Sequence, residues 1–162
     1  MVKTPSDHNS KLSKSLNVVK QVLKDAKIEY EALKNAEGFR VTLKYNEETD
    51  LIGFAHVFDE ARLFMFRILF PRRAPKAKLR DLMELTTRAN NGMWGGNFEY
   101  DLDTREIKYK TYVDYRNTVL EAIYVKNAIL GAMVMIESYA PAIDAVIDGE
   151  KTIKAALAEV EE

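Results

Sequence analysis

Residues 51–70 carry the sequence LIGFAHVFDEARLFMFRILF, in which a short polar turn at residues 59–61 separates two apolar runs. Runs of this length, rich in aromatic and branched residues, are typical of two antiparallel strands. Neither run alternates cleanly between apolar and polar residues. Successive side chains of a strand point to opposite faces. Apolar neighbours such as Phe54 and Ala55 therefore indicate that both faces of this hairpin are buried.

The segments on either side of the hairpin extend the sheet. Apolar residues recur at every second position in residues 38–45, which predicts a strand with one wet face. Further along, residues 97–101 and 107–113 flank a polar turn and predict a second hairpin. We therefore expect an α+β fold, with an antiparallel five-stranded sheet (a three-stranded meander plus a hairpin) packed with helices.

Helical periodicity appears before, between and after these strands. From Leu12 the apolar residues are spaced by four and three, as in an amphipathic helix. The stretch Thr118 to Tyr139 has hydrophobic side chains at nearly every angle, so we expect a helix covered on more than one side. Other helices are predicted from Leu79 to Ala89, from Ala142 to Ile147 and, as a peripheral piece, over residues 150–162. No composition shift divides the chain, so we predict a single domain over residues 1–162, with residues 1–9 disordered.

The composition narrows the class of protein. The chain has 162 residues, 24 Lys+Arg against 25 Asp+Glu, and no cysteine. This even charge gives no argument for a nucleic-acid or membrane partner, and the lack of cysteine excludes a thiolate zinc site. The first ten residues lack the apolar core of a secretory signal, and the longest charge-free run, residues 127–136, is too short for a membrane span. We expect a cytoplasmic protein.

A helix end, a glycine and a short hairpin carry a resemblance to a known family. The residues concerned are Asn90, Asn91, Gly96-Asn97-Phe98-Glu99-Tyr100-Asp101, Ile107-Lys108-Tyr109, Tyr139-Ala140-Pro141 and Val146-Ile147-Asp148-Gly149. Over about residues 38–149 the chain resembles the YbjN family of bacterial regulators, and its element order is similar to the type III secretion chaperone-like fold. It departs from the pattern at Arg105, where a glycine is more usual, and in the basic run after Pro71.

The resemblance implies a binding function. The chaperones form homodimers and hold extended segments of another protein, whereas the YbjN group is associated with regulation and has no established catalytic residues. We therefore predict a non-enzymatic protein-binding or regulatory protein that needs no cofactor. The alternatives are a client-specific protein chaperone and, from another class, an enzyme acting on a small molecule in a cleft near His56 and Tyr109.

The apolar second face of the hairpin is the first candidate interaction site. Monomers rarely expose large contiguous apolar patches, so this face is core under helices, a dimer interface or a groove for a partner protein or peptide. Together with residues 128–136 it presents more apolar surface than one sheet needs, which predicts a homodimer. Since aromatic side chains commonly dominate interfaces, the candidate partner-binding residues are Phe54, Phe58, Phe64 and Phe66.

A basic run after the hairpin is the second candidate. Its cations, five within nine residues and with no acid among them, are Arg72, Arg73, Lys76, Lys78 and Arg80. The run is either a solvated face or a site for an acidic protein, and nucleic acid is a partner that we do not expect. The acidic residues of positions 117–162 offer it a partner within the molecule or in a dimer mate. We expect Arg72, Arg73 and Lys76 to bind carboxylates.

Three single features complete the set of candidates. Trp94, which lies among glycines, either packs over the sheet edge or stands exposed as an anchor for a partner. His56 is expected to be a packing residue rather than a base, because no serine or carboxylate lies at a recognisable spacing from it. The acidic turn of residues 101–106 lacks the spacing of a calcium loop, so we expect it to hydrogen-bond its own backbone and to hold no metal.

Overall fold

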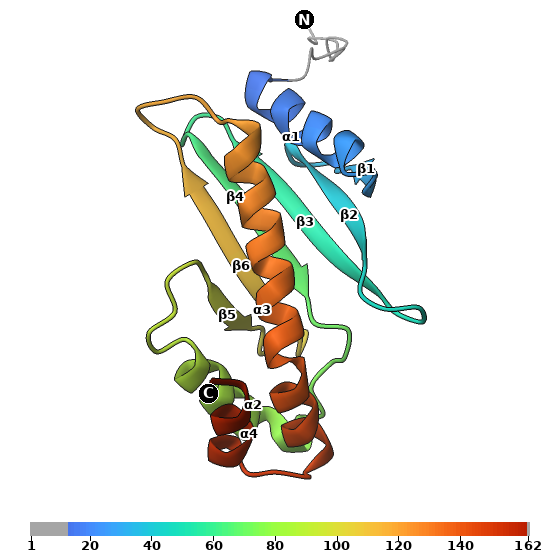
Figure 1. The fold of residues 1–162 in the computed structure, drawn as a ribbon, viewed down its shortest axis with the longest axis vertical. Helices are drawn as coiled ribbons and strands as arrows, with labels where there is room; N and C mark the ends of the chain where they lie inside the picture. Colours follow the sequence, from blue (N-terminus) through green and yellow to red (C-terminus); the bar gives the residue numbers. More distant parts are fainter. Residues whose placement is uncertain (1–12, 162) are drawn as a thin grey trace, which may run out of the picture.

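The computed structural model describes residues 13–161 and is built on one antiparallel sheet (Figure 1). Its strands are β1 Glu29–Ala32, β2 Gly38–Lys44, β3 Asp50–Phe58, β4 Leu63–Leu69, β5 Asn97–Tyr100 and β6 Ile107–Asp114. They lie in the order β1-β2-β3-β4-β6-β5, and each neighbouring pair is antiparallel. The predicted α+β fold is confirmed, with one strand more than expected, because the short β1 pairs with β2.

The described residues form four α-helices and a 3-10 turn. They are α1 Lys14–Asp25, η1 Lys76–Lys78, α2 Leu79–Ala89, α3 Ala122–Asp148 and α4 Ile153–Glu161. The helical piece predicted from Ala142 to Ile147 is the last part of α3, which continues through Pro141 and does not begin anew there. It ends at Gly149, whose φ of 75° is the left-handed conformation that glycine adopts without strain. Helix α4 lies where the peripheral helix was predicted, and the prediction for residues 1–9 lies outside the described residues.

Helices α1 and α3 pack on one face of the sheet, and α4 packs on α3 and α2 (Figure 1). Helix α3 crosses β4 and β6 with α1 beside it, while α2 and α4 surround the far end of α3 near β5. We call this face of the sheet the covered face and the opposite one the open face. Helix α3 is long and apolar enough to cross a membrane by composition alone, but half of its most apolar window is buried within the protein. This burial is that of a core helix in a soluble-type fold.

Candidate functional site

The apolar half of the open face lies on β3 and β4. The rings of Phe54, His56 and Phe58 follow one another along β3 with centroid separations of 6.3 and 6.0 Å, and the second pair is stacked. On β4, Met65 lies opposite His56 and Leu63 lies opposite Phe58. Phe58 keeps 42% of its surface exposed, and the other four side chains are half-buried. The sheet therefore presents an aromatic column, Phe54, His56 and Phe58, that the described helices leave uncovered.

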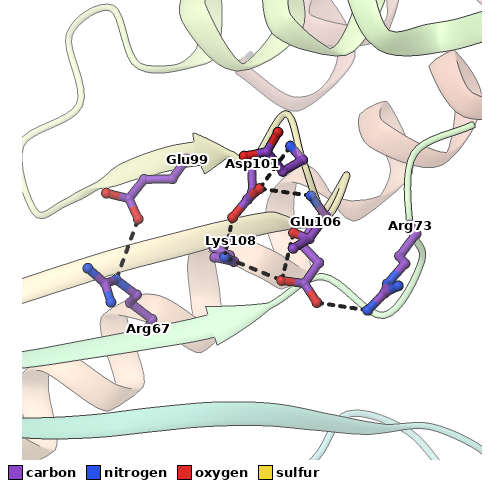
Figure 2. Close-up of polar contacts among 8 residues, drawn as sticks. Arg67, Arg73, Glu99, Asp101, Glu106 and Lys108 are labelled. Carbon is purple, nitrogen blue, oxygen red and sulfur yellow. Dashed lines mark hydrogen bonds and ion pairs between the residues drawn. The ribbon is translucent and has the colours of Figure 1, made fainter. Parts of the chain in front are cut away.

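The charged half of the open face carries two groups of ion pairs, one around Lys108 and the other between Arg67 and Glu99 (Figure 2). Its labelled members are Arg67, Arg73, Glu99, Asp101, Glu106 and Lys108. Lys108 Nζ lies 3.2 Å from a carboxylate oxygen of Asp101 and 3.3 Å from one of Glu106. Arg67 Nε lies 3.5 Å from Glu99. Most cations of this charged half form ion pairs with acids of the same protein, so these residues also stabilise the fold.

The turn between β5 and β6 stabilises the ionised form of Asp101. The Asp101 carboxylate accepts hydrogen bonds from the backbone N–H groups of Asp103 and Thr104 at 3.1 and 2.9 Å. The bond from Thr104, with Lys108 next, lowers the pKa of Asp101 to about 2. The prediction that this turn bonds its own backbone is confirmed. Within residues 13–161 no group of three or more histidines or carboxylates is arranged to hold a metal ion.

An open hollow of about 560 Å³ lies where the two halves meet. Phe54, His56 and Leu69 line it together with Arg67 and Lys108, and the β1–β2 connection at residues 33–36 forms its wall. The Nδ1 atom of His56 is buried and has no hydrogen-bond partner among the described residues. Burial, with the nearby Arg67 second, lowers the pKa of His56 and so favours its neutral imidazole. The hollow can take an apolar group beside a hydrogen-bonding or anionic one.

The four phenylalanines predicted to bind a partner divide between the two faces. Phe54 and Phe58 lie on the open face, but Phe64 and Phe66 lie on the covered face and have no exposed surface. A partner cannot reach these two rings while α3 packs on the sheet. The assignment of Phe64 and Phe66 to a binding site is therefore corrected, and both belong to the core.

The predicted enzyme cleft does not form. His56 is on the open face, whereas the ring of Tyr109 packs edge-on against Phe98 at 4.9 Å on the covered face. Burial raises the pKa of Tyr109, as expected for a phenol inside a core. The sheet itself separates the two side chains, so they cannot line one pocket.

The basic run has partners within its own chain. Arg72 makes ion pairs with Asp144 at 2.5 Å and Asp148 at 2.6 Å, at the end of α3. Arg73 lies 3.1 Å from Glu106, while Lys76 is exposed and forms no ion pair with any residue of the described range. The expectation that the run meets acids of the C-terminal region is confirmed for Arg72. Two of the three cations thus tie the segment after β4 to the fold.

Trp94 is the most exposed of the residues predicted to bind a partner. It lies in the loop between α2 and β5 and is 100% exposed. The alternative that it packs over the sheet edge is therefore wrong.

The sequence interpretation missed Arg67, Lys108 and residues 33–36 as neighbours of Phe54. Alternation along β4 and β6 places Arg67 and Lys108 on the open face, but no local signal brings the β1–β2 connection to them.

The comparisons with known proteins agree with this architecture. The family model described as "YbjN: Putative bacterial sensory transduction regulator" matches residues 15–144. The chain belongs to the YbjN family. A solved structure described as "Crystal structure of YbjN, a putative transcription regulator from E. coli" is similar, with a TM-score of 0.57 and 12% identity. The match covers 80% of this chain and 95% of that one.

At 12% identity the structural match bears on the fold alone. The match to the YbjN family model covers the whole sheet and most of α3, so it confirms the resemblance to this family. The chaperone part of that resemblance stays a prediction. No curated protein matches the chain significantly.

Proposed function

We propose that this chain is a non-enzymatic regulatory protein of the cytoplasm that binds a segment of another protein on the open face of its sheet. The observation that carries the proposal is the aromatic column on a sheet face without a covering helix. Contiguous apolar surface of this kind is typical of interaction sites. The description of the family as a regulator supports a binding role.

The hollow beside the column defines the chemistry of the partner. Phe54 and Leu69 offer apolar contact. Of the cations that line the hollow, Arg67 and Lys108 already pair with Glu99, Asp101 and Glu106, whereas Lys34 forms no ion pair with any residue of the described range. An apolar side chain next to an aspartate or glutamate fits this lining, because the apolar group packs against the rings and the carboxylate can pair with Lys34. The partner is therefore a protein segment that is apolar and acidic.

The first experiment identifies this partner in the native cell. A photo-cross-linking amino acid replaces Phe58, and in a control strain it replaces Met83, which is exposed to a similar degree on α2. We expect one protein to be cross-linked from position 58 and not from position 83. Equal cross-linking from both positions contradicts a site on the open face.

The second experiment measures affinity with the purified partner. Phe54→Ser and Phe58→Ser should each weaken binding by at least about tenfold, as truncation of an aromatic hot spot does. Met83→Ser is the matched control and should bind as the native chain does. Unchanged affinity in both phenylalanine variants, with their folding verified by circular dichroism, refutes the proposed function.

A further inference from the structure

The β1–β2 connection, residues 33–37, divides the open face along the aromatic column into two hollows. The first, of about 560 Å³, contains Phe54, and the second, of about 490 Å³, contains Phe58. Ala36 and His56 line both of them, so the connection meets the column at His56 and forms the boundary between the hollows. The column is therefore one apolar surface with two separate recesses.

The far end of the first hollow is also bounded. Leu69 lies beyond Phe54 in the direction away from His56, and it pairs with Lys108 of β6. The ammonium of Lys108 lies between two carboxylates there (Figure 2). The first hollow is thus a recess of limited length, with the connection at one end and a group of ion pairs at the other.

The two hollows differ in charge. The second is lined by three acids and by no cation of the described range: Glu37, Asp59 and Glu60. The first contains Lys34, which forms no ion pair with any described residue, beside the already paired Arg67 and Lys108. A carboxylate is therefore attracted to the first hollow and repelled from the second.

The connection supplies hydrogen-bond donors to the first hollow. No described residue accepts a hydrogen bond from the backbone N–H groups of Lys34, Asn35 and Ala36, and all three residues are exposed. Backbone N–H groups that are available in this way bind the terminal carboxylate in a recurring mode of peptide recognition. With Phe54 and Leu69 also in its lining, the hollow combines an apolar surface with an anion-binding wall.

The limited length of this recess favours a chain end over the middle of a segment. A partner that covers Phe58 enters the first hollow across the connection. An internal residue must then continue over the ion pairs of Lys108, where a carboxylate meets Asp101 and Glu106. A C-terminal residue stops short of them, and it carries its carboxylate and its side chain on the same carbon atom. The volume of the hollow lies within the roughly 300–1,000 Å³ of sites that enclose a small ligand, so a whole residue fits.

We propose that the first hollow binds the C-terminal residue of the partner. Its α-carboxylate pairs with Lys34 and accepts hydrogen bonds from the N–H groups of residues 34–36, while its apolar side chain packs on Phe54 and Leu69. This inference rests on the proposed function, because it states which part of the partner the open face binds. The acids beside Phe58 keep the same carboxylate out of the second hollow.

The first test uses two small probes, N-acetyl-leucyl-phenylalanine and its C-terminal amide, which differ only in the charged terminus. We expect the acid to bind the isolated chain at least about tenfold more tightly than the amide, because hydrogen bonds to a charged group are the stronger ones. Titration followed by NMR gives both affinities, and the amide resonances of residues 34–36 should shift with the acid. Equal affinities, or resonances of residues 34–36 that do not respond to the acid, overturn the proposal.

Two variants separate the charged part of the contact from the apolar part. Lys34→Gln should reduce the affinity for the acid to nearly that for the amide and leave binding of the amide unchanged, which also shows that the fold is intact. Leu69→Ser should weaken binding of both probes by the same factor. The matched control is Lys24→Gln, at an exposed lysine of α1, and it should change neither affinity. Native affinity for the acid in Lys34→Gln contradicts the carboxylate site.

The partner identified by cross-linking from position 58 separates this inference from the proposed function. Adding a glycine and a serine after its last residue should weaken binding by at least about tenfold, because the carboxylate leaves the hollow. The same two residues added at its N-terminus should have no effect. If the extended partner binds as tightly as the native one, the proposed function stands and the C-terminal site is refuted. If the acid probe binds at residues 34–36 but no protein is cross-linked, the hollow belongs to a free small acid, and both proposals are overturned.

Discussion

The two faces of the β3–β4 hairpin carry similar side chains in different surroundings. Phe64 and Phe66 lie beneath α3 with no exposed surface, while Phe54 and Phe58 lie on a face without a helix. The rings are chemically the same. The apolar residues of a strand therefore indicate how much of its surface tends to be buried. The packing of distant elements decides which of the two faces is buried within one chain.

The largest expected effect compares a phenylalanine from each face. Phe66→Ala leaves a cavity in the core and should lower the free energy of unfolding by about 3–5 kcal/mol. Phe54→Ala removes a half-exposed ring and should cost no more than about 1 kcal/mol. Urea denaturation midpoints of the two variants give the comparison. Similar losses at both positions would mean that the open face is covered in the isolated protein.

Two glycines sharpen the same contrast. A Cβ atom on Gly53 would lie 2.7 Å from the ring of Phe66 and 2.8 Å from Val41, so Gly53→Ala overpacks the covered face. We expect a loss of about 1–3 kcal/mol. Gly131, on α3, has no neighbour within 4 Å of such an atom. Gly131→Ala should therefore raise the stability by about 0.5–1 kcal/mol through helix propensity, and thermal unfolding of both variants should show opposite signs.

The assignment of side chains to faces was within reach of the sequence. Alternation over residues 38–70 follows from the geometry of the strand backbone. It groups Phe54 with Phe58 on one face of β3 and Phe64 with Phe66 on one face of β4, as the structure has them. It contained no information on which side the helices cover. The two pairs therefore received the same functional interpretation, and only one of them is accessible.

The hollow on the open face could not be predicted, because it depends on contacts between distant segments. Its wall at residues 33–36 follows β1, a four-residue strand whose mostly exposed side chains give no periodic signal. Lys108 reaches the same hollow only through the pairing of β4 with β6. Such contacts arise from the tertiary fold, whereas the acidic turn at residues 101–106 is a local structure and was predicted correctly.

Two threonines test the faces by their hydroxyl groups. On the covered face, Thr111 Oγ1 donates to the backbone oxygen of Ala128 in α3 at 3.0 Å. Thr111→Val removes this buried bond and should cost about 0.5–1.5 kcal/mol. Thr42→Val on the open face should change the stability by less than about 0.5 kcal/mol. Chemical denaturation distinguishes the two, and an equal cost would show that Thr42 also has a buried partner.

The smallest expected effect is a change in the pH dependence of stability at His56. It tests how accessible the open face is to water. Burial of the imidazole, with Arg67 second, lowers its pKa below the ordinary value of 6.5. As the pH falls below about 6.5, the unfolded chain binds this proton before the folded one does. The contribution of His56 to stability is therefore complete above that pH and is lost progressively down to the pKa of the folded state.

The corresponding measurement is the free energy of unfolding at pH 7.5 and pH 5.5, for the native chain and for His56→Gln. The native chain should lose more stability between the two pH values than the variant, and the difference belongs to His56. The carboxylate of a bound acidic partner in the hollow would favour the protonated ring, so saturation with that partner should reduce the difference. An identical pH dependence in both proteins would mean that water reaches His56 freely, and the aromatic column would then be less dry than the ring contacts with Phe54 and Phe58 indicate.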